Sequence, residues 1–299
     1  MVNQQHSAQG FRIETLPKAS GFRRILRVMF ARKIVIVGAV LALAFIFISV
    51  FGPFIAPYDP YKQDLGNALQ QPSRQYLLGT DAFGRDTLTR LIYGARISLM
   101  VGVVAVTIAG VIGIFLGLIA GYFGRWIDQI IMRVIDALMA LPPIALMLAI
   151  AAALGGGLFN VMISLGISMI PTYCRLMYGQ VRTLRESDYI IAARTIGASQ
   201  TRIMLRHLLP NAFPPLLVLI TLNMGTAILM EATLSFIGIG ISPPTAAWGS
   251  MINDGYRYLI TNPVLSVAPG AAIALVVLSF NLVGDGLRDA LDPRLRGTF

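Results

Sequence analysis

The sequence predicts an all-α, polytopic membrane protein with about six transmembrane helices. Of its 299 residues, 56% are hydrophobic and only 13% are charged, whereas soluble domains carry about a quarter charged residues. Apolar runs of about 20 residues recur along the chain, and this is the helix length that crosses the hydrocarbon layer. A single soluble core stops growing at roughly 250–300 residues, so this much apolar surface is expected to face lipid.

Six apolar segments are long enough to span a bilayer. They cover residues 34–56, 98–120, 129–154, 158–178, 213–237 and 265–284. The third segment is the least regular, because Arg133 and Asp136 fall in its first two turns and Pro142 and Pro143 interrupt its middle. Proline is tolerated in membrane helices where neighbouring groups satisfy the freed carbonyls. We therefore expect a helix in this segment too.

Lys and Arg residues are distributed unevenly between the segments that connect these helices. With the N-terminus in the cytoplasm, sixteen of the 24 Lys and Arg residues lie on the cytoplasmic side and six on the other side. Positive residues favour cytoplasmic flanks, so both termini are expected to be cytoplasmic. The predicted parts are a cytoplasmic basic segment (1–33), a first transmembrane helix (34–56), an extracytoplasmic segment (57–97) and a five-helix core (98–299) with a cytoplasmic loop (179–211).

Several functions are disfavoured by composition and by missing motifs. The net charge of +10 does not indicate nucleic-acid binding, because the basic residues lie between apolar runs and not on one face of a soluble domain. The single cysteine, Cys174, allows no internal disulfide and is expected to pack in the interior. Without a G-x-x-x-x-G-K-S/T phosphate-binding loop, this chain is expected to bind no cofactor and to have no ATPase or other enzyme activity.

The cytoplasmic loop reads as two short helices joined by a glycine. Ser187 and Asp188 suit the start of the first helix, as N-cap and as an acidic residue in the first turn. Apolar residues at helical spacing predict one apolar face, formed by Tyr189, Ala192, Ala193 and Ile196. Gly197 stands where a left-handed C-terminal cap is expected, and Ser199 begins a second helix that ends at Leu209 and Pro210. The loop is either a solvated hairpin or a docking element for another protein.

The same loop resembles the coupling motif of bacterial ABC importer permeases. The matching residues are Ala192, Ala193, Gly197, His207, Leu208, Leu209 and Pro210. In that family the loop docks into a cleft on the ATP-binding subunit and transmits its closure. The resemblance therefore implies that residues 187–210 couple this chain to an ATPase subunit. The glutamate that opens the family's Glu-Ala-Ala motif is Ile191 here.

Further segments resemble the dipeptide/oligopeptide/nickel permease family, and in particular its second (C-type) membrane subunit. They are 78–86 with 94–99, 121–124 with 132–136 and 141–142, 243–245 with 248–249, and 284–293. The resemblance implies the MetI-like ABC importer permease fold in the bacterial plasma (inner) membrane. It also implies a second homologous permease subunit, two ATP-binding subunits that carry ATP and Mg, and an extracytoplasmic solute-binding protein. Peptides are the leading substrates, and the family also moves nickel, glutathione and opine-like compounds.

Two acidic residues lie well inside predicted spans, where a charge at the helix centre costs about 2.5–3.5 kcal/mol on insertion scales. Asp136 follows Arg133 by one helical turn, so these two are expected to form an ion pair. Glu231 has no local charged partner, and it either faces the transport pathway or makes a structural or intersubunit hydrogen bond. All three residues are candidates for the pathway or for a subunit interface.

Two rival functions stay open from the sequence. A secondary transporter predicts inverted repeats, broken midplane helices and central ionisable residues, of which Pro142, Pro143 and Asp136 give only a hint. A membrane scaffold has no use for a glycine-jointed docking helix. Co-purification with ATPase subunits distinguishes an importer from both.

Overall fold

Helices make up nearly all of the structure, a computed structural model that describes residues 26–291. The α-helices are α2 (Lys33–Ile55), α3 (Thr87–Phe123), α4 (Arg125–Met139), α5 (Pro143–Leu154), α6 (Leu158–Leu184), α7 (Asp188–Thr195), α8 (Gln200–Arg202), α9 (Leu209–Ile237), α10 (Trp248–Tyr256) and α11 (Val264–Leu291). Two shorter elements are the 3-10 helix η1 (Leu65–Asn67) and the π-helical segment η2 (Ile203–Leu208). The predicted all-α class is confirmed for this range, and most of the basic segment predicted at 1–33 lies outside it.

Five helices are long and apolar enough to cross a membrane: α2, α3, α6, α11 and the continuous rod Gln200–Ile237, which comprises α8, η2 and α9. The third predicted span, 129–154, consists instead of α4 and α5, which are bent by 91° relative to each other. Pro143 is the first residue of α5, where its missing N–H removes no helical hydrogen bond. The double proline therefore divides this span into two helices.

The helix predicted to begin at residue 98 begins at Thr87, eleven residues earlier. Asp86 is its N-cap, and its carboxylate accepts a hydrogen bond of 2.7 Å from the backbone N–H of Thr89. A cap of this kind satisfies an amide that would otherwise lack a partner at the helix start. The apolar run located only the part of the helix that crosses the membrane, because the first turns of α3 carry polar side chains.

Helices α3 and α6 form the most extensive helix contact in the described residues, and glycines on α3 allow a close approach. A Cβ on Gly117 would lie 2.4 Å from the carbonyl oxygen of Cys174, and one on Gly113 would lie 2.8 Å from that of Ile170. Gly121 repeats the contact one turn further along. Small residues spaced by four allow membrane helices to approach backbone to backbone. Cys174 is fully buried at this contact, as predicted.

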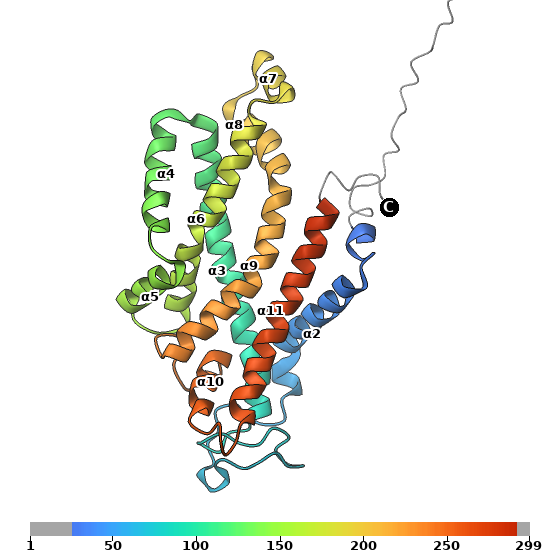
Figure 1. Cartoon of the computed structure of the whole chain (residues 1–299), viewed down its shortest axis with the longest axis vertical. Helices are drawn as coiled ribbons and strands as arrows, with labels where there is room; N and C mark the ends of the chain where they lie inside the picture. The colour runs from blue at the N-terminus through green and yellow to red at the C-terminus, as the bar shows by residue number, and fades with distance from the viewer. Residues whose placement is uncertain (1–25, 292–299) are drawn as a thin grey trace, which may run out of the picture.

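The two ends of the molecule differ in what they display (Figure 1). At one end, here called the α7 end, α7 projects beyond the long helices. At the opposite end, the α10 end, α10 lies next to the irregular segment that contains η1. Near the α7 end, α2 and α11 are joined by an ion pair of 2.6 Å between Arg32 and Asp289. The helix predicted to stop at residue 284 continues to Leu291 there.

Candidate functional site

Helix α7 is held firmly at the α7 end of the molecule by two kinds of contact. Ile190 is fully buried and Ala193 is 7% exposed, so both side chains pack into the main core. The guanidinium of Arg194 lies over the ring of Tyr122, 5.5 Å from its centroid. Just before α7, the Arg185 guanidinium donates a 3.2 Å hydrogen bond to the carbonyl oxygen of Gly121. These contacts fix α7 to the end of α3.

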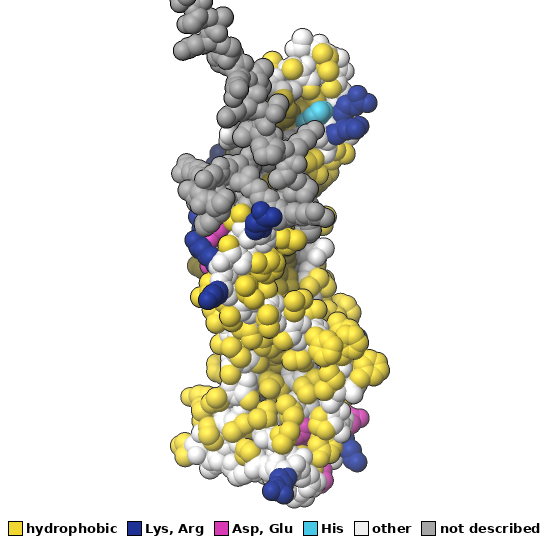
Figure 2. Space-filling view, turned by 90° about the vertical axis from the view of Figure 1, so that its right-hand side faces the viewer, with side chains coloured by type: hydrophobic (Ala, Val, Ile, Leu, Met, Phe, Trp, Pro, Cys, Tyr) yellow, Lys and Arg dark blue, Asp and Glu magenta, His cyan; other side chains and the backbone are white. Residues whose placement is uncertain are grey.

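The rest of the α7 surface is exposed, and apolar side chains make up much of it beside the polar Asp188 and Thr195. Ile196 is 84% exposed, Ile191 50% and Tyr189 42%, and Ala192 is exposed between them. Figure 2 shows hydrophobic side chains gathered at this end, with a histidine and basic side chains beside them. The sequence placed Ala193 on this same face, which is wrong, because Ala193 turns inward beside Ile190. A short helix thus packs with one face and leaves an apolar face uncovered.

Gly197 ends α7 in the conformation that the sequence predicts. Its φ is 78°, in the left-handed region, and its N–H donates to the carbonyl oxygen of Arg194 at 3.0 Å. The N–H of Ala198 donates to the carbonyl oxygen of Ala193 at 3.0 Å, which completes a Schellman motif. Ser199 then caps α8, because its hydroxyl accepts a 3.4 Å hydrogen bond from the N–H of Arg202. Ser187 begins α7, although its side chain makes no capping hydrogen bond.

The sequence predicts that the second short helix ends at Leu209 and Pro210, and this prediction is wrong. The helix passes through η2 into α9 without a break, and the N–H of Leu209 donates to the carbonyl oxygen of Met204, five residues earlier. Proline in a regular helix clashes with the carbonyl four residues before it. The wider π-helical turn relieves this clash, and Pro210 stands in the first turn of α9. His207, in η2, is half-buried.

The residues of the predicted coupling motif lie on two touching elements. Ala192, Ala193 and Gly197 belong to α7 and its C-terminal turn, while His207, Leu209 and Pro210 belong to η2 and the start of α9. The two elements α7 and η2 pack against each other. The structure therefore brings the motif together at one end of the bundle.

Asp136 does not pair with Arg133, so the predicted ion pair within one helix is wrong. Its carboxylate accepts a 2.5 Å hydrogen bond from the guanidinium of Arg175 on α6, while Arg133 is exposed and forms no ion pair within the described residues. About two turns towards the α7 end, Asp128 of α4 accepts a 2.9 Å hydrogen bond from the Tyr178 hydroxyl. Arg175 was missed in the sequence, where its signal is a lone arginine inside the span at 158–178.

Glu231 is fully buried between α9 and α3. Its carboxylate accepts hydrogen bonds from the hydroxyls of Ser235 at 2.8 Å and Ser98 at 3.3 Å. Ser235 in turn accepts a 3.0 Å hydrogen bond from the N–H of Ile241. These contacts favour the structural alternative for Glu231. Ser235 could have been identified as a partner of Glu231, because it follows Glu231 by four residues on the same helix. Ser98 lies on α3, far from Glu231 in the sequence, so no local pattern indicates this contact.

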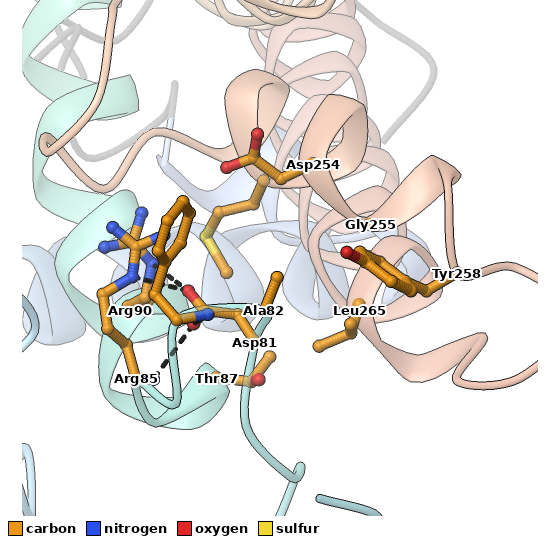
Figure 3. A pocket seen from close by; sticks show the side chains of 11 residues that line it. Asp81, Ala82, Arg85, Thr87, Arg90, Asp254, Gly255, Tyr258 and Leu265 are labelled. Carbon is orange, nitrogen blue, oxygen red and sulfur yellow. Dashed lines mark hydrogen bonds and ion pairs between the residues drawn. The ribbon is translucent and has the colours of Figure 1, made fainter. Parts of the chain in front are cut away.

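A small pocket at the α10 end holds a cluster of charges (Figure 3). The Asp81 carboxylate accepts a 2.6 Å hydrogen bond from Arg85 and lies 3.5 Å from the Arg90 guanidinium. Arg90 also donates to the carbonyl oxygen of Pro244 at 3.3 Å, so it joins two connecting segments. Partial burial raises the pKa of the nearby Asp254 carboxyl. Asp81 and Asp86 thus have turn and cap roles. No metal-binding group of His, Cys, Asp and Glu occurs within residues 26–291.

The bundle of long apolar helices defines a multi-pass membrane protein. A family model described as "Binding-protein-dependent transport system inner membrane component" matches residues 113–297. The chain belongs to this family of binding-protein-dependent transport permeases. A second model, "N-terminal TM domain of oligopeptide transport permease C", matches residues 20–72, so the chain is of the C-type subunit that the sequence resembles.

Relatives share most of the length of the chain. It is 44% identical over 277 residues to the "Dipeptide transport system permease protein DppC" of Alkalihalophilus pseudofirmus, which covers 93% of this chain and 91% of that protein. It is 43% identical over 262 residues to the "Probable D,D-dipeptide transport system permease protein DdpC" of Escherichia coli, with 88% of each chain covered. A "Glutathione transport system permease protein GsiD" of Shigella sonnei is 44% identical over 260 residues, with 87% and 86% covered.

The fold is also similar to a solved structure, the inward-facing MetNI methionine ABC transporter. The TM-score is 0.54 at 21% sequence identity, and the match covers 69% of this chain and 97% of that chain. The predicted MetI-like permease fold is therefore confirmed.

Proposed function

We propose that this chain is the C-type permease subunit of an ATP-driven importer of di- or oligopeptides or related small solutes. The names of the three relatives support a peptide substrate, because dipeptides, D,D-dipeptides and glutathione are all short peptides. The chain lies in the bacterial plasma membrane with both termini in the cytoplasm, so the α7 end is the cytoplasmic end. Lys and Arg residues concentrated in the segments at that end support this orientation.

The importer contains a second homologous permease subunit, two ATP-binding subunits and an extracytoplasmic solute-binding protein. This chain forms half of the pathway, and ATP is hydrolysed in the partners. The observation that carries the proposal is the exposed apolar face of α7, formed by Tyr189, Ile191, Ala192 and Ile196. An apolar face beyond the membrane-crossing helices is expected to be covered by another protein.

Force applied to α7 reaches the bundle through two connections. The first consists of Arg194 on Tyr122 and Arg185 on Gly121, which tie α7 to the end of α3. The second is the contact with η2, which continues as a single rod to Ile237. Closure of the ATP-binding subunits displaces α7, and the displacement moves α3 and α9 together. The pathway thereby switches from inward-facing to outward-facing.

Changing Ile196→Asp tests this docking surface. A carboxylate placed in an apolar contact has to be desolvated without a partner, so we expect the variant to co-purify with at least about tenfold less ATPase subunit. Ile260→Asp is the matched control, since Ile260 is 99% exposed at the α10 end. ATPase recovery is measured by quantitative blotting after affinity purification of this chain. Equal recovery with both variants would contradict the proposal.

A further inference from the structure

Two acidic residues of α4 and two basic residues of α6 form a ladder of opposite charges. The first rung is the ion pair of 2.5 Å between Asp136 and Arg175. The second rung, nearer the α7 end, is formed by Asp128 and Arg182, whose charged atoms lie 3.5 Å apart. We call these four residues the charge ladder. The coupling motif contains none of them.

The first rung lies on the helices of the bundle, set back from their ends at the α7 end. Arg175 precedes the end of α6 by nine residues, which is about 14 Å along the helix axis. Its neighbour Cys174 packs against Gly117, six residues before the end of α3, or about 9 Å along that helix. Charged side chains on membrane-crossing helices are costly in contact with lipid, and they face a bundle interior or a water-filled cavity instead.

Neither partner of the first rung is saturated by this chain. The side chains of Asp136 and Arg175 are 48% and 50% exposed, and their mutual contact is the one polar contact of these two side chains within the described residues. An Arg guanidinium carries five N–H donors, and a carboxylate has two acceptor oxygens. Both groups therefore keep hydrogen-bonding capacity that this chain does not use.

We propose that the first rung of the charge ladder binds the two charged termini of a zwitterionic peptide inside the transport pathway. The peptide carboxylate pairs with the guanidinium of Arg175, where two parallel hydrogen bonds are possible, and the peptide ammonium pairs with the carboxylate of Asp136. Every charge keeps an opposite partner during this exchange, which avoids leaving a charge uncompensated. The proposal rests on the proposed function, because it requires that this face lines the pathway.

The second rung then offers the next pair of charges towards the α7 end. Arg182 is 48% exposed, while Asp128 is 16% exposed and also accepts a hydrogen bond from Tyr178. A ligand released from the first rung meets an arginine and a carboxylate again on its way to the cytoplasmic end. Sites that are repeated and individually weak favour passage over retention.

Direct binding of a small peptide to the assembled importer tests this subsite. The complete importer, in lipid nanodiscs without ATP and without its solute-binding protein, is incubated with labelled alanyl-alanine. N-acetyl-alanyl-alanine, which lacks the ammonium, and alanyl-alanine amide, which lacks the carboxylate, are the competitors. We expect each blocked peptide to compete about tenfold more weakly than unlabelled alanyl-alanine, since each loses one charge-assisted contact.

The variants give a crossed pattern that a purely structural ion pair would not produce. With Arg175→Gln, the disadvantage of the amide disappears and that of the N-acetyl peptide remains. With Asp136→Asn, the disadvantage of the N-acetyl peptide disappears and that of the amide remains. Asp285→Asn is the control, because Asp285 is an exposed carboxylate on α11. With this variant, both blocked peptides compete as weakly as they do with the unmodified importer.

Three results would overturn the charge-ladder proposal. Alanyl-alanine does not bind, all three peptides compete equally, or the blocked peptides keep the same disadvantages in Arg175→Gln and Asp136→Asn as in the unmodified importer. ATP hydrolysis by the same nanodiscs is measured first, as the check on assembly. If the complex assembles and hydrolyses ATP but shows any of these results, the ladder proposal alone is wrong. If this chain recruits no ATPase subunit, the importer proposal and the ladder proposal fall together.

Discussion

Gly197 shows how one residue can matter without making a side-chain contact. Its φ of 78° lies in the left-handed region, and a Cβ added there would meet nothing within 4 Å. A substitution at this position therefore tests the backbone conformation and nothing else. Because the turn sets the angle between α7 and α8, its conformation decides how the exposed face of α7 is presented.

We expect Gly197→Val to uncouple ATP hydrolysis from uptake while the protein still inserts into the membrane. Left-handed backbone costs an L-residue roughly 1–2 kcal/mol, and a β-branched residue resists it most, so the turn rearranges. The ratio of peptide taken up to ATP hydrolysed is measured in reconstituted vesicles. Gly179→Ala is the control, since Gly179 also has open space around it but lies within α6 at an ordinary φ. Normal coupling in Gly197→Val would refute this role for the turn.

At the scale of single elements, the α3–α6 pair forms the most extensive helix contact in the described residues. Gly113, Gly117 and Gly121 follow each other at four-residue spacing and bring the two backbones into contact. The sequence contains this spacing as a small-residue pattern, but it does not identify the helix that packs against the glycines. The partner is α6, whose backbone carbonyls at Ile170 and Cys174 face the glycines.

Gly117→Val is expected to destabilise the chain by about 1–3 kcal/mol, because overpacking forces the helices apart. The added Cβ would lie 2.4 Å from the carbonyl oxygen of Cys174, and that backbone atom cannot rotate away. Gly110→Ala serves as the control, since its Cβ would meet the Tyr173 ring at 3.9 Å, an ordinary contact. Thermal unfolding of the purified importer in detergent measures both. An unchanged transition temperature for Gly117→Val would show that the helix pair tolerates separation.

Helix existence was more predictable than helix ends. Apolar runs of about 20 residues located every membrane-crossing segment, because lipid imposes this length. The start of α3 was missed because its first turns are polar and depend on the Asp86 cap. The continuation of η2 through Pro210 was missed because proline normally ends a helix, and only the π-helical turn accommodates it here. Local chemistry that departs from the average rule cannot be read from hydropathy.

At the scale of the whole molecule, the chain leaves large apolar surfaces uncovered. Exposed apolar side chains follow the length of α2, including Val40 at 60% and Leu43 at 65%, as expected for a helix that faces lipid. Those on α7 stand apart from this surface, at the end of the bundle (Figure 1). A bilayer covers the first kind of surface, and our proposal assigns an ATP-binding subunit to the second.

The candidate site was only partly predictable, because some of its features are local in the sequence and others depend on distant residues. The alanine pair and Gly197 form a local pattern, so the sequence was sufficient to find them. The orientation of Ala193, the pairing of Asp136 with Arg175, and the bridge from Glu231 to Ser98 depend on neighbours far away in the chain. Such contacts arise from helix packing, which one sequence does not specify residue by residue.

The docking of α7 onto an ATPase subunit is tested most directly by photo-crosslinking from Ala192→Cys carrying a benzophenone label. Cys174 is fully buried and stays in place, and Ile260→Cys at the α10 end is the control. On illumination of the purified, ATP-hydrolysing importer, we predict a covalent adduct between residue 192 and an ATP-binding subunit, and none from residue 260. An importer that hydrolyses ATP but gives no such adduct from residue 192 would contradict the account.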